Sequence, residues 1–351
     1  MTTVTVRASR PYEVTIGRGL LDTVGRQAAG QWKGRSAAVV SDSTVAPLYL
    51  NRVKDSLERA GFRVHSFVFP AGEDQKNGGT YLKLLEFLAA RRLTRADGLI
   101  ALGGGVVGDL AGFAAATILR GVDFVQIPTT LLAQVDSSVG GKVAVDLKAG
   151  KNLAGAFWQP RLVLMDPSVL GTLEDHAFSD GMAEVIKYGC IFDADFYSFL
   201  EQRPSRDQVM AEIEHVLYTC CDLKRRVVLE DERDTGARML LNFGHTLGHA
   251  YELAGRYETW THGQAVAAGM VKAARLGTAL GVTPEGTAER IGVLLGCFGL
   301  PLEIPCTAEE YAAAVGLDKK GAGRDISVIL LEEIGRAAAR KMPKAELLAL
   351  L

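Results

Sequence analysis

The stretch GLIALGGGVVGD, residues 98–109, joins a short apolar run to three consecutive glycines. The run at residues 98–102 has the composition of a buried β-strand, and the residues after the glycines can begin a helix. Such a turn lets backbone N–H groups approach a diphosphate, which the helix N-terminus also favours. The stretch does not match GxGxxG, so a tight turn that only requires small residues is an open alternative. It predicts one strand, turn and helix of an α/β fold.

Strand and helix patterns alternate on both sides of this stretch. Apolar residues alternate with polar ones at positions 4–6 and 12–16, on either side of a turn at residues 9–11, which predicts an opening hairpin. Further short β-rich runs predict strands at residues 37–40, 64–69, 124–127 and 162–165, separated by helical spacing at residues 45–60 and 81–91. This alternation is typical of a mostly parallel sheet with right-handed crossovers.

Beyond Pro167 the strand patterns nearly vanish. Alanine-rich segments with helical period predict helices at residues 179–189, 208–229, 241–254 and 264–280. The fold prediction is therefore an α/β nucleotide-binding domain over residues 1–166, followed by an all-α domain over residues 167–351.

Length and composition limit the class of protein. At 351 residues the chain exceeds the usual size of one core, and 48% apolar with 23% charged residues is ordinary for a soluble globular protein. A net charge of −2 argues against nucleic acid or an anionic membrane as the main partner. No transmembrane-length apolar run or signal-peptide core is seen, which predicts a cytoplasmic protein. Five cysteines without CxxC spacing are expected to be reduced.

Three of the six histidines lie within the segment RMLLNFGHTLGHAYELAGRYETWTHG, residues 238–263. His245 and His249 are four residues apart, which places both on one face of a helix and would allow them to chelate one zinc. The alternative is that both only satisfy buried hydrogen bonds. A third histidine, His262, together with a carboxylate would complete an open catalytic site.

Polar residues follow several of the predicted strands. In an open parallel sheet the strand carboxyl ends form the ligand crevice, so these residues favour a nucleotide there. Asp42 would hold ribose hydroxyls, while Lys76, Thr129 and Thr130 would position phosphate or nicotinamide.

Lysines gather in DSSVGGKVAVDLKAGKNLAGAFWQP, residues 136–160. With the neighbouring glycines and Asn152 they suit a phosphorylated or carboxylated small substrate. Further on, GMAEVIKYG supplies Glu184 and Lys187, three residues apart on one helical face. Glu184 is the carboxylate candidate for the metal, although an exposed glutamate-lysine pair has the same spacing.

Several long motifs together resemble the 3-dehydroquinate synthase family of the sugar-phosphate cyclase superfamily. In chain order they are GGGVVGD (103–109), PTTLLAQVDSSVGGK (128–142), KNLAGAFWQP (151–160), GMAEVIKYG (181–189), DERDTGARMLLNFGHTLGHAYE (231–252), HG (262–263) and DKK (318–320). The resemblance implies an N-terminal NAD-binding α/β domain, a C-terminal helical domain and a homodimer. It also implies NAD and a divalent metal, usually zinc with cobalt as an alternative.

The resemblance implies a role for each matching residue. The metal ligands would be Glu184, His245 and His262, so that His249 handles protons and substrate instead of binding the metal. The implied NAD positions are Asp42, Glu73, Lys76, Gly104, Gly105, Asp109, Thr129, Thr130 and Thr172. The implied catalytic and substrate positions are Lys142, Lys187, Lys224 and His249, with Arg120, Asp136, Lys151, Asn152, Arg238, Asn242 and Lys320. Arg120 would reach the substrate phosphate across the dimer interface.

The implied reaction converts 3-deoxy-D-arabino-heptulosonate 7-phosphate into 3-dehydroquinate and phosphate. Transient oxidation at carbon 5 acidifies the neighbouring C–H bond and allows phosphate to leave, after which re-reduction, ring opening and an aldol step close the carbocycle. Two alternatives are a metal-dependent NAD alcohol or glycerol dehydrogenase, which would not need the lysine cluster, and a sister cyclase. Sister cyclases act on substrates without a carboxylate. The residues that argue against that alternative are Arg238, Lys224, Asn152 and His249.

Overall fold

Contacts within the computed structural model divide the chain into two compact units. Unit 1 comprises Met1–Leu173 and Lys224–Arg233, and unit 2 comprises Glu174–Leu223 and Asp234–Leu351. The structure describes all residues except 235, 256–258 and 318–323. The boundary predicted after residue 166 lies a few residues before the division at Leu173, and the predicted second domain includes residues 224–233, which the contacts place in unit 1.

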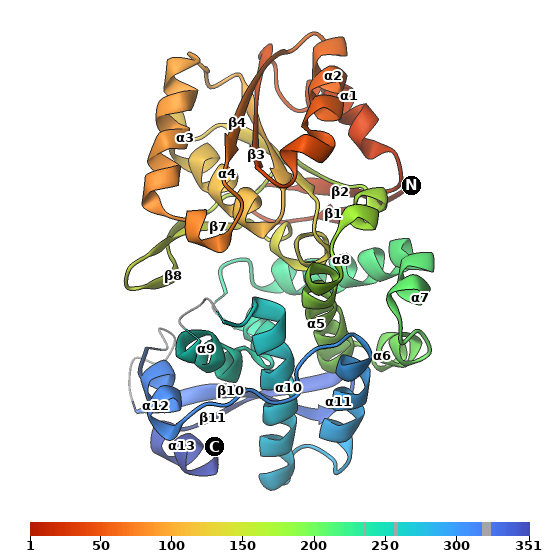
Figure 1. Ribbon diagram of the computed structural model, residues 1–351, viewed down its shortest axis with the longest axis vertical. Coiled ribbons are helices and arrows are strands. Elements are labelled where there is room, and N and C mark those ends of the chain that lie inside the picture. Colours follow the sequence, from red (N-terminus) through yellow and green to blue (C-terminus); the bar gives the residue numbers. More distant parts are fainter. Residues whose placement is uncertain (235, 256–258, 318–323) are drawn as a thin grey trace. The chain divides into compact units, whose positions relative to one another are not determined.

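Unit 1 is built around a seven-stranded sheet in the order β1-β2-β9-β6-β5-β3-β4. Figure 1 labels β1, β2, β3 and β4 of this sheet. Only β1 is antiparallel to its neighbour, and the other pairs are parallel. The strands are β1 (Thr2–Val6), β2 (Tyr12–Ile16), β3 (Ser36–Asp42), β4 (Arg63–Phe69), β5 (Gly98–Gly103), β6 (Asp123–Pro128) and β9 (Leu162–Met165). The opening hairpin and the five predicted parallel strands are all present.

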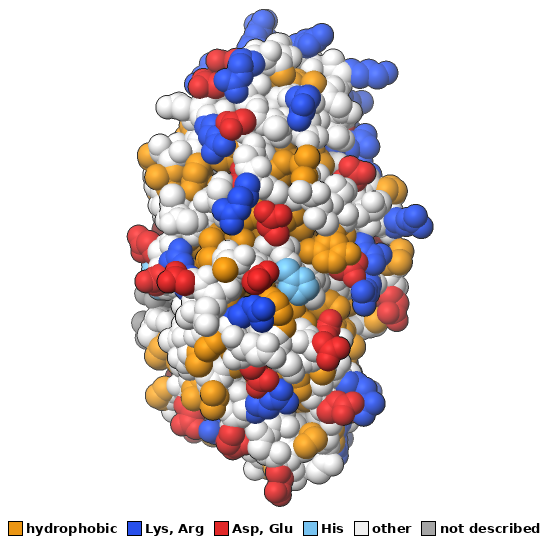
Figure 2. Space-filling view, turned by 90° about the vertical axis from the view of Figure 1, so that its right-hand side faces the viewer, with side chains coloured by type: hydrophobic (Ala, Val, Ile, Leu, Met, Phe, Trp, Pro, Cys, Tyr) orange, Lys and Arg blue, Asp and Glu red, His pale blue; other side chains and the backbone are white. Residues whose placement is uncertain are grey.

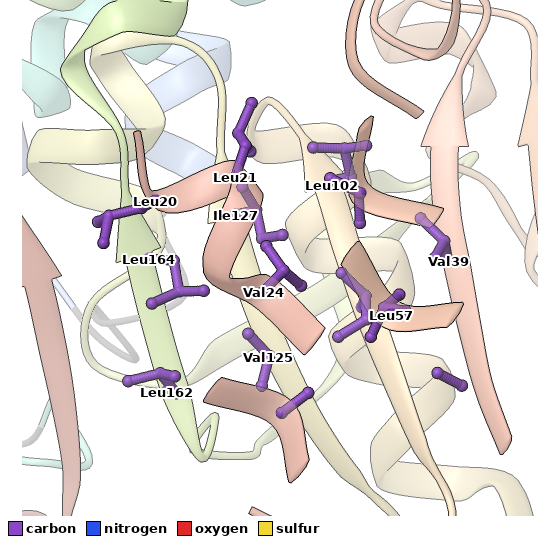
Figure 3. Close-up of a cluster of buried hydrophobic side chains, with 14 of the residues drawn as sticks. Leu20, Leu21, Val24, Val39, Leu57, Leu102, Val125, Ile127, Leu162 and Leu164 are labelled. Carbon is purple, nitrogen blue, oxygen red and sulfur yellow. The ribbon is translucent and has the colours of Figure 1, made fainter. Parts of the chain in front are cut away.

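Helices cover both faces of this sheet because side chains alternate along each strand. On one face Val39, Ile100 and Val125 pack against Val24 and Leu57 of the first two helices, a cluster shown in Figure 3. On the other face Ala38, Leu99 and Phe124 pack against α3 (Gly78–Ala90), α4 (Gly105–Thr117) and the hairpin of β7 (Lys142–Leu147) and β8 (Gly150–Phe157). The helical elements are η1 (Leu20–Thr23), α1 (Val24–Ala29), η2 (Ala46–Leu50), α2 (Asn51–Arg59), η3 (Glu73–Gln75), α3 (Gly78–Ala90), α4 (Gly105–Thr117), η4 (Ile118–Arg120), η5 (Ala133–Ser137) and η6 (Pro167–Thr172).

A two-stranded hairpin, β7 (Lys142–Leu147) and β8 (Gly150–Phe157), contains the lysine cluster of the sequence. The sequence patterns did not predict these strands. Val143 and Val145 of β7 are buried against the sheet face, and the backbone N–H of Asp146 donates to the carbonyl of Lys76 at 2.7 Å. The hairpin is thereby fixed beside the segment that follows β4.

Unit 2 is mainly helical, as predicted. Its helical elements are α5 (Asp175–Phe192), α6 (Ala194–Glu201), α7 (Arg206–Ala211), α8 (Ile213–Glu230, whose last turns belong to unit 1), η7 (Ala237–Asn242), α9 (His245–Ala254), α10 (His262–Ala279), α11 (Thr287–Cys297), α12 (Ala308–Leu317) and α13 (Lys344–Leu350). Helix α10 contacts α5, α9 and α11, so it forms the centre of the unit.

Three details of unit 2 differ from the sequence prediction. The domain is not purely helical, because β10 (Asp325–Glu333) and β11 (Arg336–Pro343) form an antiparallel hairpin whose Ile326, Val328 and Leu330 are buried. The helix predicted over residues 208–229 is divided into α7 and α8. The helix predicted over residues 241–254 begins only at His245, because Gly244 has a φ of 78° and separates α9 from η7.

Helices α9 and α10 approach each other closely through glycine. A Cβ atom on Gly269 of α10 would overlap the carbonyl oxygen of Gly244, and one on Gly248 would crowd the carbonyl oxygen of Ala265. Because the first residues of the two helices are His245 and His262, this contact also sets the distance between the two imidazoles.

We expect Gly269→Ala to lower the free energy of unfolding by about 1–3 kcal/mol, the usual cost of overpacking a filled site. It should also weaken metal binding, because α9 and α10 must separate to accommodate the methyl group. Gly296→Ala is the matched control, since its Cβ in α11 would meet nothing within 4 Å. That control should be neutral or stabilising by up to about 1 kcal/mol. Urea denaturation measures the free energy of unfolding, and chelator competition measures metal affinity. If Gly269→Ala and Gly296→Ala had the same stability and the same metal affinity, the expectation would be contradicted.

Within the described residues no helix is long and apolar enough to cross a membrane. On the face drawn in Figure 2, acidic and basic side chains are interspersed. This pattern agrees with the small net charge of −2.

Candidate metal centre and nucleotide site

Three side chains in unit 2 are arranged as a set of metal ligands. Glu184 lies in the middle of α5, while His245 and His262 are the first residues of α9 and α10. One ligand atom from each lies within 4.8 Å of the others. Oε1 of Glu184 is 3.5 Å from Nε2 of His245 and 3.4 Å from Nε2 of His262. Two imidazoles and one carboxylate are a donor set typical of catalytic zinc.

Helix α5 also fixes the start of α10. Asp180, one turn before Glu184, accepts a hydrogen bond from the backbone N–H of Gly263 at 2.6 Å and another from the hydroxyl of Thr261. Thr261 and Gln264 form a capping box at the same helix end. The position of His262 is therefore set by local capping and by α5 together.

Each of the two clustered imidazoles has a second partner on its other nitrogen. Nδ1 of His245 is 3.2 Å from the carbonyl oxygen of Phe243, and Nδ1 of His262 is 3.4 Å from Oε1 of Glu252. These acceptors suit a proton on Nδ1 of each ring, and Nε2 of each ring faces Glu184. Metal-binding histidines commonly have such an outer partner, so the donor set fits a divalent metal.

Burial and charge shift the pKa values in this cluster in different directions. Burial, followed by the charge of Lys187, lowers the pKa of His245 to about 3. Burial opposes the charged form of His262 as well, but hydrogen bonds to Glu184 and Glu252 outweigh it and raise the pKa to about 10. Burial favours the neutral form of Glu252 and would by itself raise its pKa. Hydrogen bonds from His249 and His262 outweigh this effect and hold the pKa of Glu252 well below its ordinary value.

His249 lies one turn after His245 on the same face of α9 but has a different environment. Its Nδ1 is 2.6 Å from Oε2 of Glu252, and its side chain is 60% exposed. The three residues that gather as potential ligands are Glu184, His245 and His262, and His249 is not among them. The helical His245–His249 chelate suggested by spacing is thus not the set that this geometry favours.

Other predicted residues of unit 2 lie near this cluster or before it in the chain. Lys187 is 1% exposed and forms an ion pair with Glu184. Arg238, which is 3% exposed, and Asn242 lie on η7, directly before α9. Arg238 does not lie on the helix that carries His245, because η7 ends at Asn242 and the turn at Gly244 precedes α9. Lys320 lies outside the described residues.

In unit 1 the carboxyl ends of the parallel strands meet at one edge of the sheet. This edge contains the predicted NAD residues Asp42, Glu73, Lys76, Gly104, Gly105, Asp109, Thr129 and Thr130. The segment GGGVVGD forms the end of β5, the turn and the first turn of α4, as predicted. Helix α4 has Gly104 at its N-cap and no side-chain cap.

Two observations at this edge fit a nucleotide. Thr129 is 4% exposed, and its Oγ1 has no hydrogen-bond partner among the described residues. A Cβ on Gly104 would approach Thr130 to 3.0 Å, and one on Gly105 would approach Ser137 to 3.2 Å, so glycine keeps this turn open. An unpaired buried hydroxyl beside an uncapped helix N-terminus suits a polar anionic ligand.

Lys76 connects predicted NAD residues with predicted substrate residues. Its Nζ lies 2.6 Å from Oδ2 of Asp109, 2.6 Å from Oδ1 of Asn152 and 3.8 Å from Oε1 of Glu73. Lys151 lies 3.9 Å from the same Glu73 oxygen. Burial opposes the charge of Lys76, but Asp109 and Glu73 outweigh it and raise the pKa of the lysine. The structure thus brings these five residues together.

The remaining predicted residues of unit 1 have separate surroundings. Nζ of Lys224, near the end of α8, lies 2.8 Å from Oδ1 of Asp136. The hydroxyl of Thr172 is 2.5 Å from that of Tyr49, and Oδ1 of Asp42 accepts from the backbone N–H of Thr44 at 2.8 Å. Lys142 is exposed at the start of β7, and exposed Arg120 has a φ of 66°.

The sequence analysis missed two residues that organise the metal cluster. Glu252 follows His249 by three residues, which is the same helical spacing that drew attention to Glu184 and Lys187. Asp180 precedes Glu184 by four residues and was detectable in the same way. Neither residue could be paired with the start of α10 from the sequence, because the contacts of Glu252 and Asp180 with that helix end join different helices.

Comparisons with known proteins match both units. Residues 66–180 match the family model for the N-terminal part of 3-dehydroquinate synthase, and residues 181–321 match the model for its C-terminal part. The chain is 47% identical to 3-dehydroquinate synthase of Clostridium botulinum over 93% of this chain and 94% of that protein. It is 46% identical to the enzyme of the same name from Streptococcus gordonii over 96% of both.

Solved structures show the same fold. A 2-deoxy-scyllo-inosose synthase complexed with carbaglucose-6-phosphate, NAD+ and Co2+ matches with a TM-score of 0.89 and 28% identity, over 99% of both chains. A 2-epi-5-epi-valiolone synthase from Streptomyces hygroscopicus with NAD+ and Zn2+ bound matches with a TM-score of 0.85 and 26% identity, over 97% of this chain and 95% of that one. A glycerol dehydrogenase from Schizosaccharomyces pombe, with a TM-score of 0.65 and 17% identity over 96% and 87%, shares the fold alone.

Proposed function

Since the chain belongs to the 3-dehydroquinate synthase family, we propose specific tasks for its residues in the reaction of that family. The chain is a lyase that converts 3-deoxy-D-arabino-heptulosonate 7-phosphate into 3-dehydroquinate and phosphate, and it uses NAD and a divalent metal. The observation that carries the assignment of tasks is the cluster of Glu184, His245 and His262.

Glu184, His245 and His262 would hold the metal. Their support is the proximity of their ligand atoms and the outer partners that orient both imidazoles. Such a metal would supply polarisation of the reacting substrate oxygen, and bound NAD would supply a reversible hydride acceptor. Lys187 would then change its contacts, because its present partner Glu184 would donate to the metal.

The remaining residues of the unit 2 set would bind polar groups of the substrate, accept a proton and stabilise negative charge. His249, with Nδ1 bonded to Glu252, would present Nε2 to a substrate hydroxyl or a departing proton. Arg238 offers a planar fork that matches a carboxylate, and Asn242 would hydrogen-bond a substrate hydroxyl. Lys187 would stabilise developing negative charge. Lys320 is proposed on resemblance alone.

The strand-end residues of unit 1 would bind NAD. Thr129, Thr130, Gly104 and Gly105 would contact phosphate and nicotinamide groups, while Asp42 would accept from ribose hydroxyls. Glu73, Lys76, Asp109 and Thr172 complete the proposed set. Asp109 and Asn152 hold Lys76, which supports a rigid site.

A second group in unit 1 would bind the phosphorylated substrate. Lys142, Lys151 and Lys224 are its cations, and Asp136 orients Lys224 through the contact described above. Asn152 would hydrogen-bond the substrate and also accepts from Lys76. The substrate phosphate would act as its own base, which leaves these lysines to stabilise charge. In a cytoplasmic homodimer, Arg120, exposed on η4, would bind the phosphate of the substrate held by the partner subunit. An expected dimer is measurable by light scattering.

The two alternative activities are not favoured. The glycerol dehydrogenase described above matches at 17% identity, which is a likeness of fold only. The sister cyclases match at 26–28%, whereas enzymes named 3-dehydroquinate synthase match at 46–47%. The deciding assay incubates the metal-loaded protein with the heptulosonate phosphate and follows phosphate and dehydroquinate.

We expect the same assay to need only catalytic amounts of NAD. Because the hydride returns within one cycle, NAD at about one hundredth of the substrate concentration should support complete conversion. Absorbance at the NADH wavelength should not grow in step with product. Stoichiometric accumulation of NADH would instead indicate a dehydrogenase, and a reaction without heptulosonate is the control.

A further inference from the structure

Glu252 serves two histidines with different proposed tasks. Its side chain is only 2% exposed, and it lies on α9 three residues after His249. Oε2 is 2.6 Å from Nδ1 of His249, while Oε1 is 3.4 Å from Nδ1 of His262. Each carboxylate oxygen therefore faces a different ring.

An ionised carboxylate can only accept hydrogen bonds. Both rings must then carry a proton on Nδ1 to bond Glu252. When His262 binds a metal as a neutral ring, its lone pair is then on Nε2, the atom that lies 3.4 Å from Glu184 Oε1. A proton on Nδ1 likewise leaves Nε2 of His249 as an acceptor, on a ring that is 60% exposed and accessible to another molecule.

We propose that Glu252 is a positioning residue that sets the tautomers of His262 and His249 together. It would thereby couple the orientation of a metal ligand to the proton-accepting state of a substrate residue. This inference rests on the tasks proposed above for the two histidines. It adds a residue that acts on both rings through its two carboxylate oxygens.

Glu252→Gln separates the effect on His262 from the effect on His249, because an amide has the same shape as the carboxylate but offers one acceptor and one donor group. With metal on Nε2, His262 must keep its Nδ1 proton and will engage the amide oxygen. The amide NH2 then faces His249 and forces the His249 proton onto Nε2. Metal affinity should fall at most tenfold, while kcat should fall about 10- to 100-fold, the usual effect of losing an outer partner. The change in KM should be smaller than that in kcat.

The tautomers can be read directly without an activity assay. The chain has only six histidines, so 15N-histidine labelling of the zinc-loaded protein gives few ring signals to assign by substitution. In Glu252→Gln the His249 signals should change from an Nδ1–H to an Nε2–H pattern, and those of His262 should not. Glu252→Asp keeps two acceptors and should keep both tautomers, even if its kcat falls. Exposed Glu289→Gln on α11 is the matched control and should change neither tautomers nor kinetics.

A double substitution supplies the second test. In a His249→Ala protein the amide of Gln at position 252 can turn its oxygen to His262, so adding Glu252→Gln should hardly lower kcat further. Fully additive losses, or a Glu252→Gln protein with unchanged His249 tautomer, would overturn the inference. If instead His262→Ala retains tight metal binding, the proposed ligand set is wrong whatever Glu252 does. Failure of the inference about Glu252 is therefore distinguishable from failure of the proposed metal-ligand set.

Discussion

His262→Ala and His245→Ala are each expected to abolish tight zinc binding, whereas His249→Ala should keep the metal and lower turnover. The reason is geometric, because Glu184, His245 and His262 bring ligand atoms within 4.8 Å of one another and His249 is instead bonded to Glu252. The spacing of His245 and His249 alone would predict the opposite result for His249 and His262.

The effect on catalysis should be large for the ligand variants. A bound metal ion supplies several kcal/mol of charge stabilisation in the transition state, so its loss should lower kcat/KM by about three orders of magnitude or more. Metal analysis of the purified variants, together with competition by a chelator, measures binding directly. Circular dichroism should show a folded protein in each case.

The contrary outcome is clearly defined. Loss of zinc from His249→Ala with retention in His262→Ala would establish the helical chelate and reject the ligand set proposed here. His176→Ala is a suitable control, because His176 is exposed at the start of α5 and should bind no catalytic metal.

The sheet of unit 1 could be predicted because its strands are short, apolar and separated by regular helices. The predicted strand at residues 162–165 is β9 as observed, and the run at residues 98–102 ends one residue before β5 does. The hairpin β7–β8 was missed because Gly150, Gly155 and its lysines weaken the strand pattern. The buried alternation of Ile326 and Val328 in β10 was present in the sequence but was overlooked among helical segments.

The site could be predicted in part from local spacing. Helical periodicity correctly placed Glu184 and Lys187 on one face, where they form an ion pair. It could not bring His262 to His245, because these residues start different helices whose distance depends on a close contact between Gly244 and Gly269. Tertiary contacts of this kind leave no periodic pattern, so the resemblance to a family was needed to suggest the three residues together.

Arg238→Met is expected to lower kcat/KM for the carboxylated heptulosonate by about two orders of magnitude. A guanidinium binds a carboxylate through two parallel hydrogen bonds, and loss of such a contact in a desolvated site costs roughly 2–5 kcal/mol. Arg238 is 3% exposed on η7, two turns of chain before His245. Because the turn at Gly244 separates η7 from α9, the expectation rests on burial, on charge and on the resemblance.

The controls for Arg238 must separate binding from structure, because so buried a side chain also packs. Arg238→Lys keeps the charge but lacks the planar fork, and it should recover only part of the lost efficiency. Zinc content and the unfolding midpoint should remain close to those of the unsubstituted protein in both variants. If Arg238→Met keeps near-normal efficiency, or if the unsubstituted protein prefers a sugar phosphate without a carboxylate, Arg238 has a structural role. The carboxylate of the substrate would then be bound by another cation.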